Sequence, residues 1–177
     1  MSISRSNPSH THEPRRDRKP QPAPKDTAAV GAITIEQARS VLAAQPFSVL
    51  LQSRLIAFSR NGAVMDVDLR EQLKQQHGFA HGGVINYLVD NAITFAAGAI
   101  FGPAVVTGGF SIDYLRPATG TMLRATAQTV RAGQNQAVVR CEVFDQDDAE
   151  FRLCAVGQGR VMARGSTGAV PVRGQPA

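Results

Sequence analysis

A single uninterrupted stretch, residues 83–101, most limits how this chain can fold. It contains no proline and alanine is frequent in it, so it predicts one long helix. Apolar residues fall on nearly every side of the predicted helix, which is typical of a helix buried on most sides. The rest of the chain must therefore provide an apolar surface large enough to cover it.

Strand-like runs precede and follow this helix. Two come before it, at residues 49–59 and 63–69, and four come after it, at residues 105–116, 122–131, 136–145 and 151–164. Asn61-Gly62 between the first two runs is typical of a hairpin turn, and the later links are short. Short links favour one antiparallel sheet. The sequence therefore predicts an α+β domain over residues 33–164, with an antiparallel six-stranded sheet wrapped around one long central helix.

The edges of this domain differ from its middle in composition. Thr34 is a suitable N-cap for a short helix over residues 35–44, which Pro46 is expected to end. Residues 1–32 hold five of the ten prolines and carry an excess of three positive charges, so a disordered basic tail is expected. Residues 165–177 are expected to form a flexible C-terminal tail. Because most of the net charge of +5 lies in these tails, it does not indicate a nucleic-acid partner.

Several other classes of protein are disfavoured. The longest apolar run, residues 92–101, is interrupted by Thr94 and is shorter than the roughly 20 residues that a membrane helix needs. The N-terminus has no apolar signal-peptide core, so we expect a cytoplasmic protein without a membrane partner. His77 and His81 have helical spacing, but the glycines around them disfavour a helix and no third ligand is evident, so no metal site is expected.

The predicted long helix carries one strip of small or polar residues. On a helical wheel they fall within about 80° of one another: Gly83, Asn86, Asp90, Thr94 and Ala97. A carboxylate in an apolar helix is costly unless it is paired or functional, and Asp90 allows both interpretations. The free N–H groups at the glycine-rich helix start could polarise an acyl carbonyl, although such helix starts are common.

Three segments resemble a known family. Residues 78–84 (GFAHGGV) and 88–91 (LVDN) are similar to the HGG…D signature of the PaaI-type hotdog thioesterases of the phenylacetate pathway, and residues 111–118 (SIDYLRPA) resemble that family's next strand. The resemblance covers about residues 47–163. It implies the hotdog fold and hydrolysis of acyl-CoA, with coenzyme A as part of the substrate and no other cofactor. It also implies a homodimer, often paired into a homotetramer.

The resemblance also implies residue roles. Asp90 matches the catalytic acid, Gly82 matches the residue whose N–H binds the thioester carbonyl, and His81 matches its supporting histidine. Gln75 stands where some members carry an asparagine that contacts the carbonyl, and Thr107 stands where some use a serine to hold the water. These last two residues differ in type from the family pattern, although each could keep the hydrogen bond.

Further residues are candidates for contact with the substrate. They are Gly83, Asn86, Asn91 and Thr94 on the long helix, and Arg116 and Arg131 in the strand-like runs. An arginine pairs well with the phosphates of CoA, although arginines at strand ends are often simply solvated.

The spacing of Gly82 and Asp90 argues for a shared site. Eight residues of helix separate them by about 12 Å, too far for both to reach one thioester carbon. Antiparallel helices of two subunits would bring Gly82 of one near Asp90 of the other. Two alternatives stay open, namely a hotdog hydratase or dehydratase that uses His81, and a non-catalytic acyl-CoA-binding protein.

Overall fold

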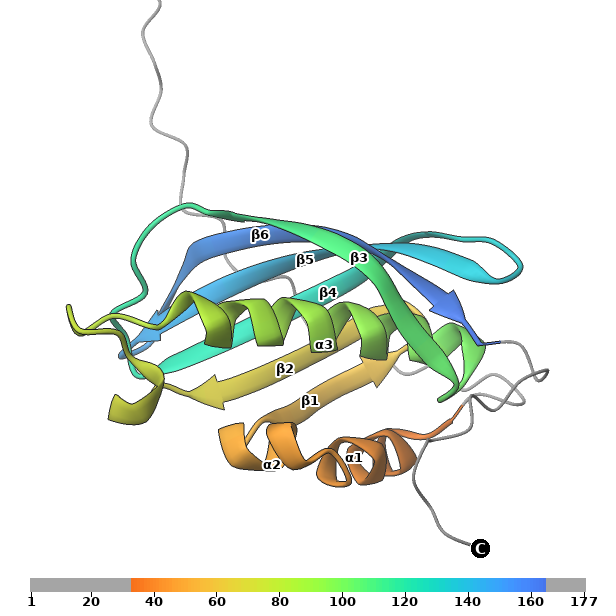
Figure 1. The fold of residues 1–177 in the computed structure, drawn as a ribbon, viewed down its shortest axis with the longest axis horizontal. Helices are drawn as coiled ribbons and strands as arrows, with labels where there is room; N and C mark the ends of the chain where they lie inside the picture. Colours follow the sequence, from red (N-terminus) through yellow and green to blue (C-terminus); the bar gives the residue numbers. More distant parts are fainter. Residues whose placement is uncertain (1–32, 165–177) are drawn as a thin grey trace, which may run out of the picture.

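The computed structural model describes residues 33–164, and the two predicted tails lie outside the described residues. Figure 1 shows a curved sheet with one long helix, α3 (Gly82–Phe101), lying across its concave face. The sheet is antiparallel and its six strands follow the order β1-β2-β4-β5-β6-β3. This arrangement confirms the predicted sheet and central helix.

The helix α3 is the centre of the core. His81 caps its start, and its apolar side chains pack against the sheet, with Leu88, Ala92 and Ile93 fully buried. By length and composition this helix could cross a membrane, which corrects the expectation that the apolar run is too short. Within the fold, however, 67% of its most apolar 18-residue stretch is buried, as expected for the core helix of a domain.

The strands largely follow the predicted ranges. They are β1 (Arg54–Ser59), β2 (Gly62–Asp68), β3 (Val105–Tyr114), β4 (Met122–Ala132), β5 (Gln136–Asp147) and β6 (Glu150–Ala163). The turn before β2 lies at Asn61-Gly62 as predicted, with Gly62 at a φ of 155°. The strand β5 runs on to Asp147, because the turn into β6 is tighter than predicted and Asp148 has a positive φ of 52°.

The first strand prediction is wrong at its start. The first helix, α1 (Ile35–Ala43), is capped by Thr34 as predicted, but a second helix, α2 (Pro46–Leu51), follows where a strand was expected from residue 49. Pro46 occupies the first turn of α2, where its missing N–H costs nothing and its fixed φ suits the helix. The proline therefore starts a helix as well as ending one. Gln52 closes it with a left-handed φ of 55°.

The strand β3 is an edge of the sheet, since it pairs only with β6 among the described strands. Its register shifts between Thr107 and Gly109, where Gly109 has a φ of 137°. Side chains alternate between the two faces of a regular strand, so Thr107 and Tyr114, an odd number of residues apart, would point to opposite faces. The bulge shifts this alternation by one residue and lets both reach α3.

Candidate active site

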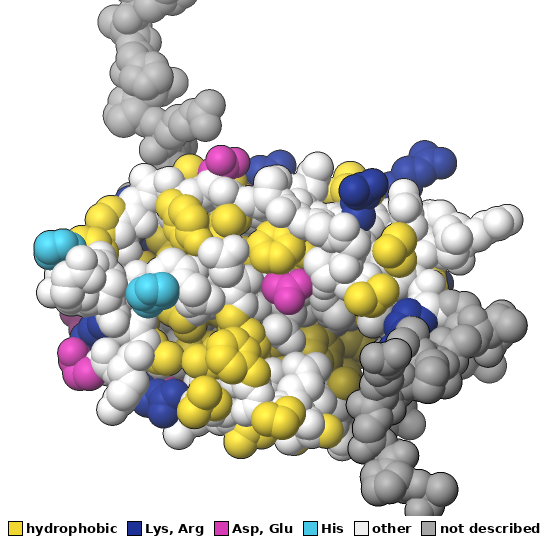
Figure 2. Space-filling model, viewed as in Figure 1, with side chains coloured by type: hydrophobic (Ala, Val, Ile, Leu, Met, Phe, Trp, Pro, Cys, Tyr) yellow, Lys and Arg dark blue, Asp and Glu magenta, His cyan; other side chains and the backbone are white. Residues whose placement is uncertain are grey.

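The strip predicted on α3 is the part of the helix that the sheet leaves uncovered. Asn86, Asp90 and Thr94 are half-buried, whereas most of their neighbours on the helix are buried. Ala97, expected to share the strip, is fully buried, so the strip ends at Thr94. On this face of the molecule an acidic side chain lies over the middle of α3 among apolar and uncharged groups (Figure 2).

Asp90 is held by hydroxyl groups from two elements. The Thr107 hydroxyl on β3 donates to Asp90 Oδ1 at 2.7 Å, and Thr94 Oγ1 lies 2.8 Å from Thr107 Oγ1. The Thr94 hydroxyl also donates to the Asp90 main-chain carbonyl oxygen at 2.8 Å, so Thr94 contacts the main chain of Asp90 while Thr107 contacts its carboxylate. Among the described residues Oδ2 of Asp90 has no partner, so it is free to accept a proton.

The N–H groups of Gly82 and Gly83, at the start of α3, have different surroundings. The Gly83 N–H donates to His81 Nδ1 at 2.9 Å, so His81 caps the helix and, when neutral, carries its proton on Nε2. Within residues 33–164 no acceptor is found for the Gly82 N–H. The orphan amide that a helix start offers to a ligand is therefore that of Gly82 and not that of Gly83.

Tyr114 is a site residue that the sequence analysis did not single out. Its hydroxyl, from the end of β3, donates to the Gly82 carbonyl oxygen at 3.1 Å and accepts from Asn86 Nδ2. Asn86 Nδ2 also lies 3.1 Å from the same carbonyl. Tyr114 and Asn86 thus hold the peptide that follows Gly82 in place. The available signal was its position in the same predicted strand as Thr107.

Burial alone does not identify Asp90, because two other carboxylates are more buried. Asp145 is fully buried and accepts the N–H groups of Thr119 at 3.0 Å and Gly120 at 2.8 Å. Asp66 is 3% exposed and accepts two hydrogen bonds from Arg124, at 2.8 and 2.7 Å. Both carboxylates are satisfied inside the fold. Asp90 differs from them in lying on a partly open face with a free oxygen.

The remaining predicted site residues lie around this centre. Gln75 is half-buried in the loop before α3, where its carbonyl accepts from the Gly78 N–H. Asn91 is half-buried beside Asp90, and its amide contacts the Tyr87 carbonyl at 3.4 Å. No hydrogen bond among the described residues joins either side chain to Asp90.

The two predicted arginines are not brought together. Arg116 is half-buried just beyond β3 and lines a cleft of about 440 Å³ that also borders Gly82 and Tyr114. Its Nε is buried and has no partner within the described part of the chain. Arg131 is exposed at the end of β4 opposite Val138, near the other end of the sheet. The geometry thus places Arg116, and not Arg131, beside the helix start.

No metal site is built by the described residues. Over residues 33–164 no three His, Cys, Asp or Glu side chains form a group that could hold an ion. His77 stacks on Phe79 with ring centroids 5.9 Å apart, while His81 caps the helix. A site without metal or cofactor stays a prediction.

The chain is similar in sequence to known thioesterases. Residues 77–151 match the family described as the thioesterase superfamily. The acyl-coenzyme A thioesterase PaaI of Escherichia coli is 32% identical over 100 residues, which cover 56% of this chain and 71% of that protein.

Solved structures agree with this result. The structure of E. coli PaaI superposes with a TM-score of 0.68 at 25% identity, covering 74% of this chain and 93% of that one. A thioesterase family protein from Silicibacter pomeroyi gives a TM-score of 0.69 at 27% identity, covering 73% and 96% of the two chains. These likenesses confirm the hotdog fold that the motifs implied.

Proposed function

The chain belongs to the thioesterase superfamily and is a thioesterase, and from that premise we propose that it hydrolyses an acyl-CoA with Asp90 as the catalytic carboxylate. The observation that carries this proposal is the pair of Asp90 and Thr107. A carboxylate with one oxygen held at 2.7 Å and the other free is oriented to accept a proton from water or to attack an acyl carbon.

The proposed site is shared by two copies of the chain. Gly82 and Asp90 lie eight residues apart on α3, about 12 Å along its axis, so one carbonyl cannot bind both in one subunit. The edge strand β3 carries partly exposed apolar side chains, among them Val106, Phe110 and Tyr114. An unpaired edge with such side chains is suited to pairing with a second copy. That pairing would set the two α3 helices beside each other.

In the proposed reaction the thioester carbonyl accepts the Gly82 N–H of one subunit. Asp90 of the other subunit removes a proton from water, whose oxygen attacks the acyl carbon, and the Gly82 N–H stabilises the resulting oxyanion. The intermediate collapses as the C–S bond breaks, and the proton passes to the CoA thiolate. The products are the free acid and CoA. In a second version Asp90 attacks the acyl carbon directly, the C–S bond breaks and CoA thiolate leaves. Water then hydrolyses the mixed anhydride, which gives the acid, regenerates the Asp90 carboxylate and supplies the proton that the thiolate takes up.

Other parts of the site have supporting roles in this proposal. His81, Asn86 and Tyr114 hold the start of α3. Thr107 orients the Asp90 carboxylate, and Thr94 contacts both Thr107 and the Asp90 main chain. The cleft beside Gly82 would take the arm of CoA, with Arg116 facing a phosphate. Supporting roles only are proposed for Gln75, Gly83, Asn91 and Arg131, since among the described residues no hydrogen bond joins them to the Asp90 carboxylate. We also propose that the chain forms a dimer of dimers and acts in the cytoplasm.

The alternatives fit the geometry less well. A hydratase needs a histidine whose ring acts on the substrate, but Nδ1 of His81 accepts the Gly83 N–H and caps the helix. A non-catalytic binding protein would need no oriented carboxylate with a free oxygen.

A panel of aryl, short-chain and long-chain acyl-CoAs tests the proposal. Release of free CoA by the wild-type chain, and its loss in Asp90→Asn, is the expected result. Hydration of an enoyl-CoA without CoA release would favour the hydratase instead. Tight acyl-CoA binding without any turnover would favour the binding protein.

A further inference from the structure

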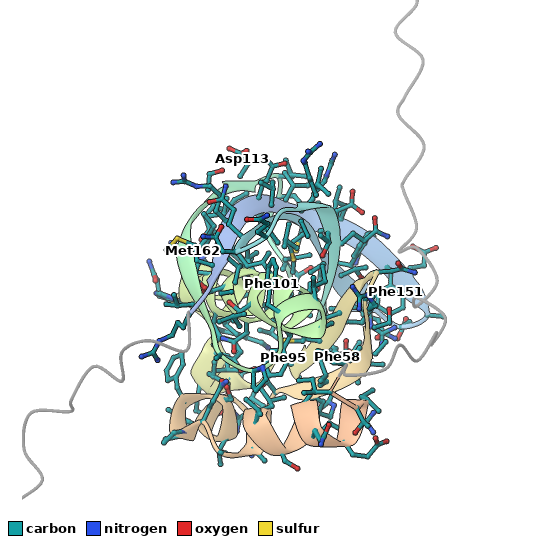
Figure 3. All side chains as sticks on the ribbon, turned by 90° about the vertical axis from the view of Figure 1, so that its right-hand side faces the viewer. Phe58, Phe95, Phe101, Asp113, Phe151 and Met162 are labelled. Atoms are coloured by element: carbon teal, nitrogen blue, oxygen red, sulfur yellow. The ribbon has the colours of Figure 1, made fainter. Side chains whose placement is uncertain are left out.

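A small, partly open cavity, apolar except for Thr94 and Gln45, lies one helical turn beyond Asp90. It has a volume of about 110 Å³ and is bounded by Thr94, Phe95 and Gly98 of α3, by Val41 of α1 and by Phe58 of β1. Figure 3 shows Phe58 and Phe95 together between α3 and α1, and their rings meet edge to face with centroids 6.4 Å apart. Figure 2 shows apolar side chains gathered on the face between α3 and the α1–α2 pair.

Thr94 belongs both to the wall of the cavity and to the hydrogen-bonded group around Asp90. This residue lines the cavity, and its hydroxyl lies 2.8 Å from that of Thr107, which donates to Asp90. Four residues of helix place Thr94 about 6 Å along the axis from Asp90. An acyl chain whose carbonyl carbon lies at Asp90 therefore reaches the cavity within a few bonds.

Gly98, which lines the cavity, is a glycine that neither the backbone nor the packing of α3 requires. Its φ is not in the left-handed region, and a Cβ added to it would meet only Val105 Cγ2, at an ordinary contact distance of 3.8 Å. Neither backbone conformation nor close packing therefore requires glycine here, although glycine is the poorest helix former except proline. What its missing side chain provides is room in the cavity.

From this geometry we infer that the cavity is the acyl pocket, and that it selects short aliphatic acyl groups. The inference rests on the proposed function. A methylene group is close in size to a water molecule, so about 110 Å³ holds about four carbon atoms at roughly 30 Å³ each. A cavity of about 150 Å³ binds benzene, and the cavity here is about 40 Å³ smaller. Because the carbonyl carbon and the first chain carbon lie outside the cavity, beside Asp90, acyl groups of about four to six carbons fit, whereas aryl and long-chain groups do not.

The test compares Gly98→Ala with Gly133→Ala across straight-chain acyl-CoAs and two aryl-CoAs. Gly133 lies in the turn after β4, where a Cβ would also meet only an ordinary contact, 3.6 Å from Gln136 O. Wild-type kcat/KM should be highest for short chains and fall about tenfold or more once the chain outgrows the pocket. Gly98→Ala should move the optimum to shorter chains, and Gly133→Ala should not move it. Phe95→Leu should move it to longer chains.

The same series is measured as binding of 2-oxoalkyl thioethers of CoA, which cannot be hydrolysed. If no acyl-CoA is hydrolysed, the proposed function fails. The size of the pocket can still be measured, from the way the affinity for the thioethers depends on chain length. Thermal unfolding of each variant shows that it is folded. A preference for aryl or long chains, or identical chain-length profiles for Gly98→Ala and Gly133→Ala, would overturn the assignment of the pocket.

Discussion

At the scale of single residues, the fold separates carboxylates that stabilise it from one that faces the open strip. Asp145→Asn should lower the free energy of unfolding by about 2–3 kcal/mol, because a buried carboxylate that accepts two backbone N–H groups is lost. The folded variant should keep its kcat. Asp90→Asn should show the opposite pattern, with kcat lost and stability kept. Urea unfolding and initial rates of CoA release measure both, and the same pattern in both variants would contradict the distinction.

The hydroxyl of Thr107 gives a second residue-scale prediction. Thr107→Val keeps the shape of the side chain but removes the donor to Asp90, so kcat should fall by about 10- to 100-fold while KM changes little. Thr107→Ser is the matched control and should keep most of the rate, since it restores the hydroxyl. Equal losses in both variants would show that the methyl group matters and not the hydrogen bond.

The cysteines give a third prediction. Burial raises the pKa of the Cys154 thiol to about 12 and also raises that of Cys141, so both should stay protonated at pH 8. A thiol reagent should then label neither cysteine in the folded protein and both in denaturant. As pH rises above the unfolded value of about 9, stability should fall, because only the unfolded state releases these protons. Rapid labelling of the native protein at pH 8 would contradict the burial.

At the scale of elements, the bulge in β3 is what brings Thr107 and Tyr114 to the same helix. Gly109→Ala places a side chain at a φ of 137° and should cost about 1–3 kcal/mol of unfolding free energy, together with part of kcat. Gly108→Ala is the neighbouring control, because its Cβ would meet no atom closer than 3.4 Å. If the two variants are equally stable and equally active, the bulge does not position the site.

At the scale of the whole molecule, the long helix, the sheet and the strip containing Asp90 could be predicted because they follow from periodicity and from the absence of breakers. Helix α2 could not, because Pro46 suits a helix start as well as a helix end. The roles of Tyr114 and Gly98 could not be predicted from the sequence either, since they depend on a bulge and on tertiary contacts that the sequence pattern does not show. Periodicity indicates which face a residue is on, but not what it meets there.

The shared site is the central claim, and a mixture of two inactive variants tests it most directly. Asp90→Asn removes the carboxylate, and Gly82→Pro removes the N–H at the first position of α3, where proline is tolerated. Gly82→Ala keeps the N–H and is the control for the added side chain, whose Cβ would lie 3.2 Å from Tyr114 Oη.

A heterodimer of the two variants has one site with both defects and one site with neither. Each parent alone should be inactive, and co-refolding should restore up to about half the wild-type rate per heterodimer. If folded heterodimers form and remain inactive while Gly82→Ala is active, Gly82 and Asp90 do not complete one another across two chains, and the proposed mechanism is wrong.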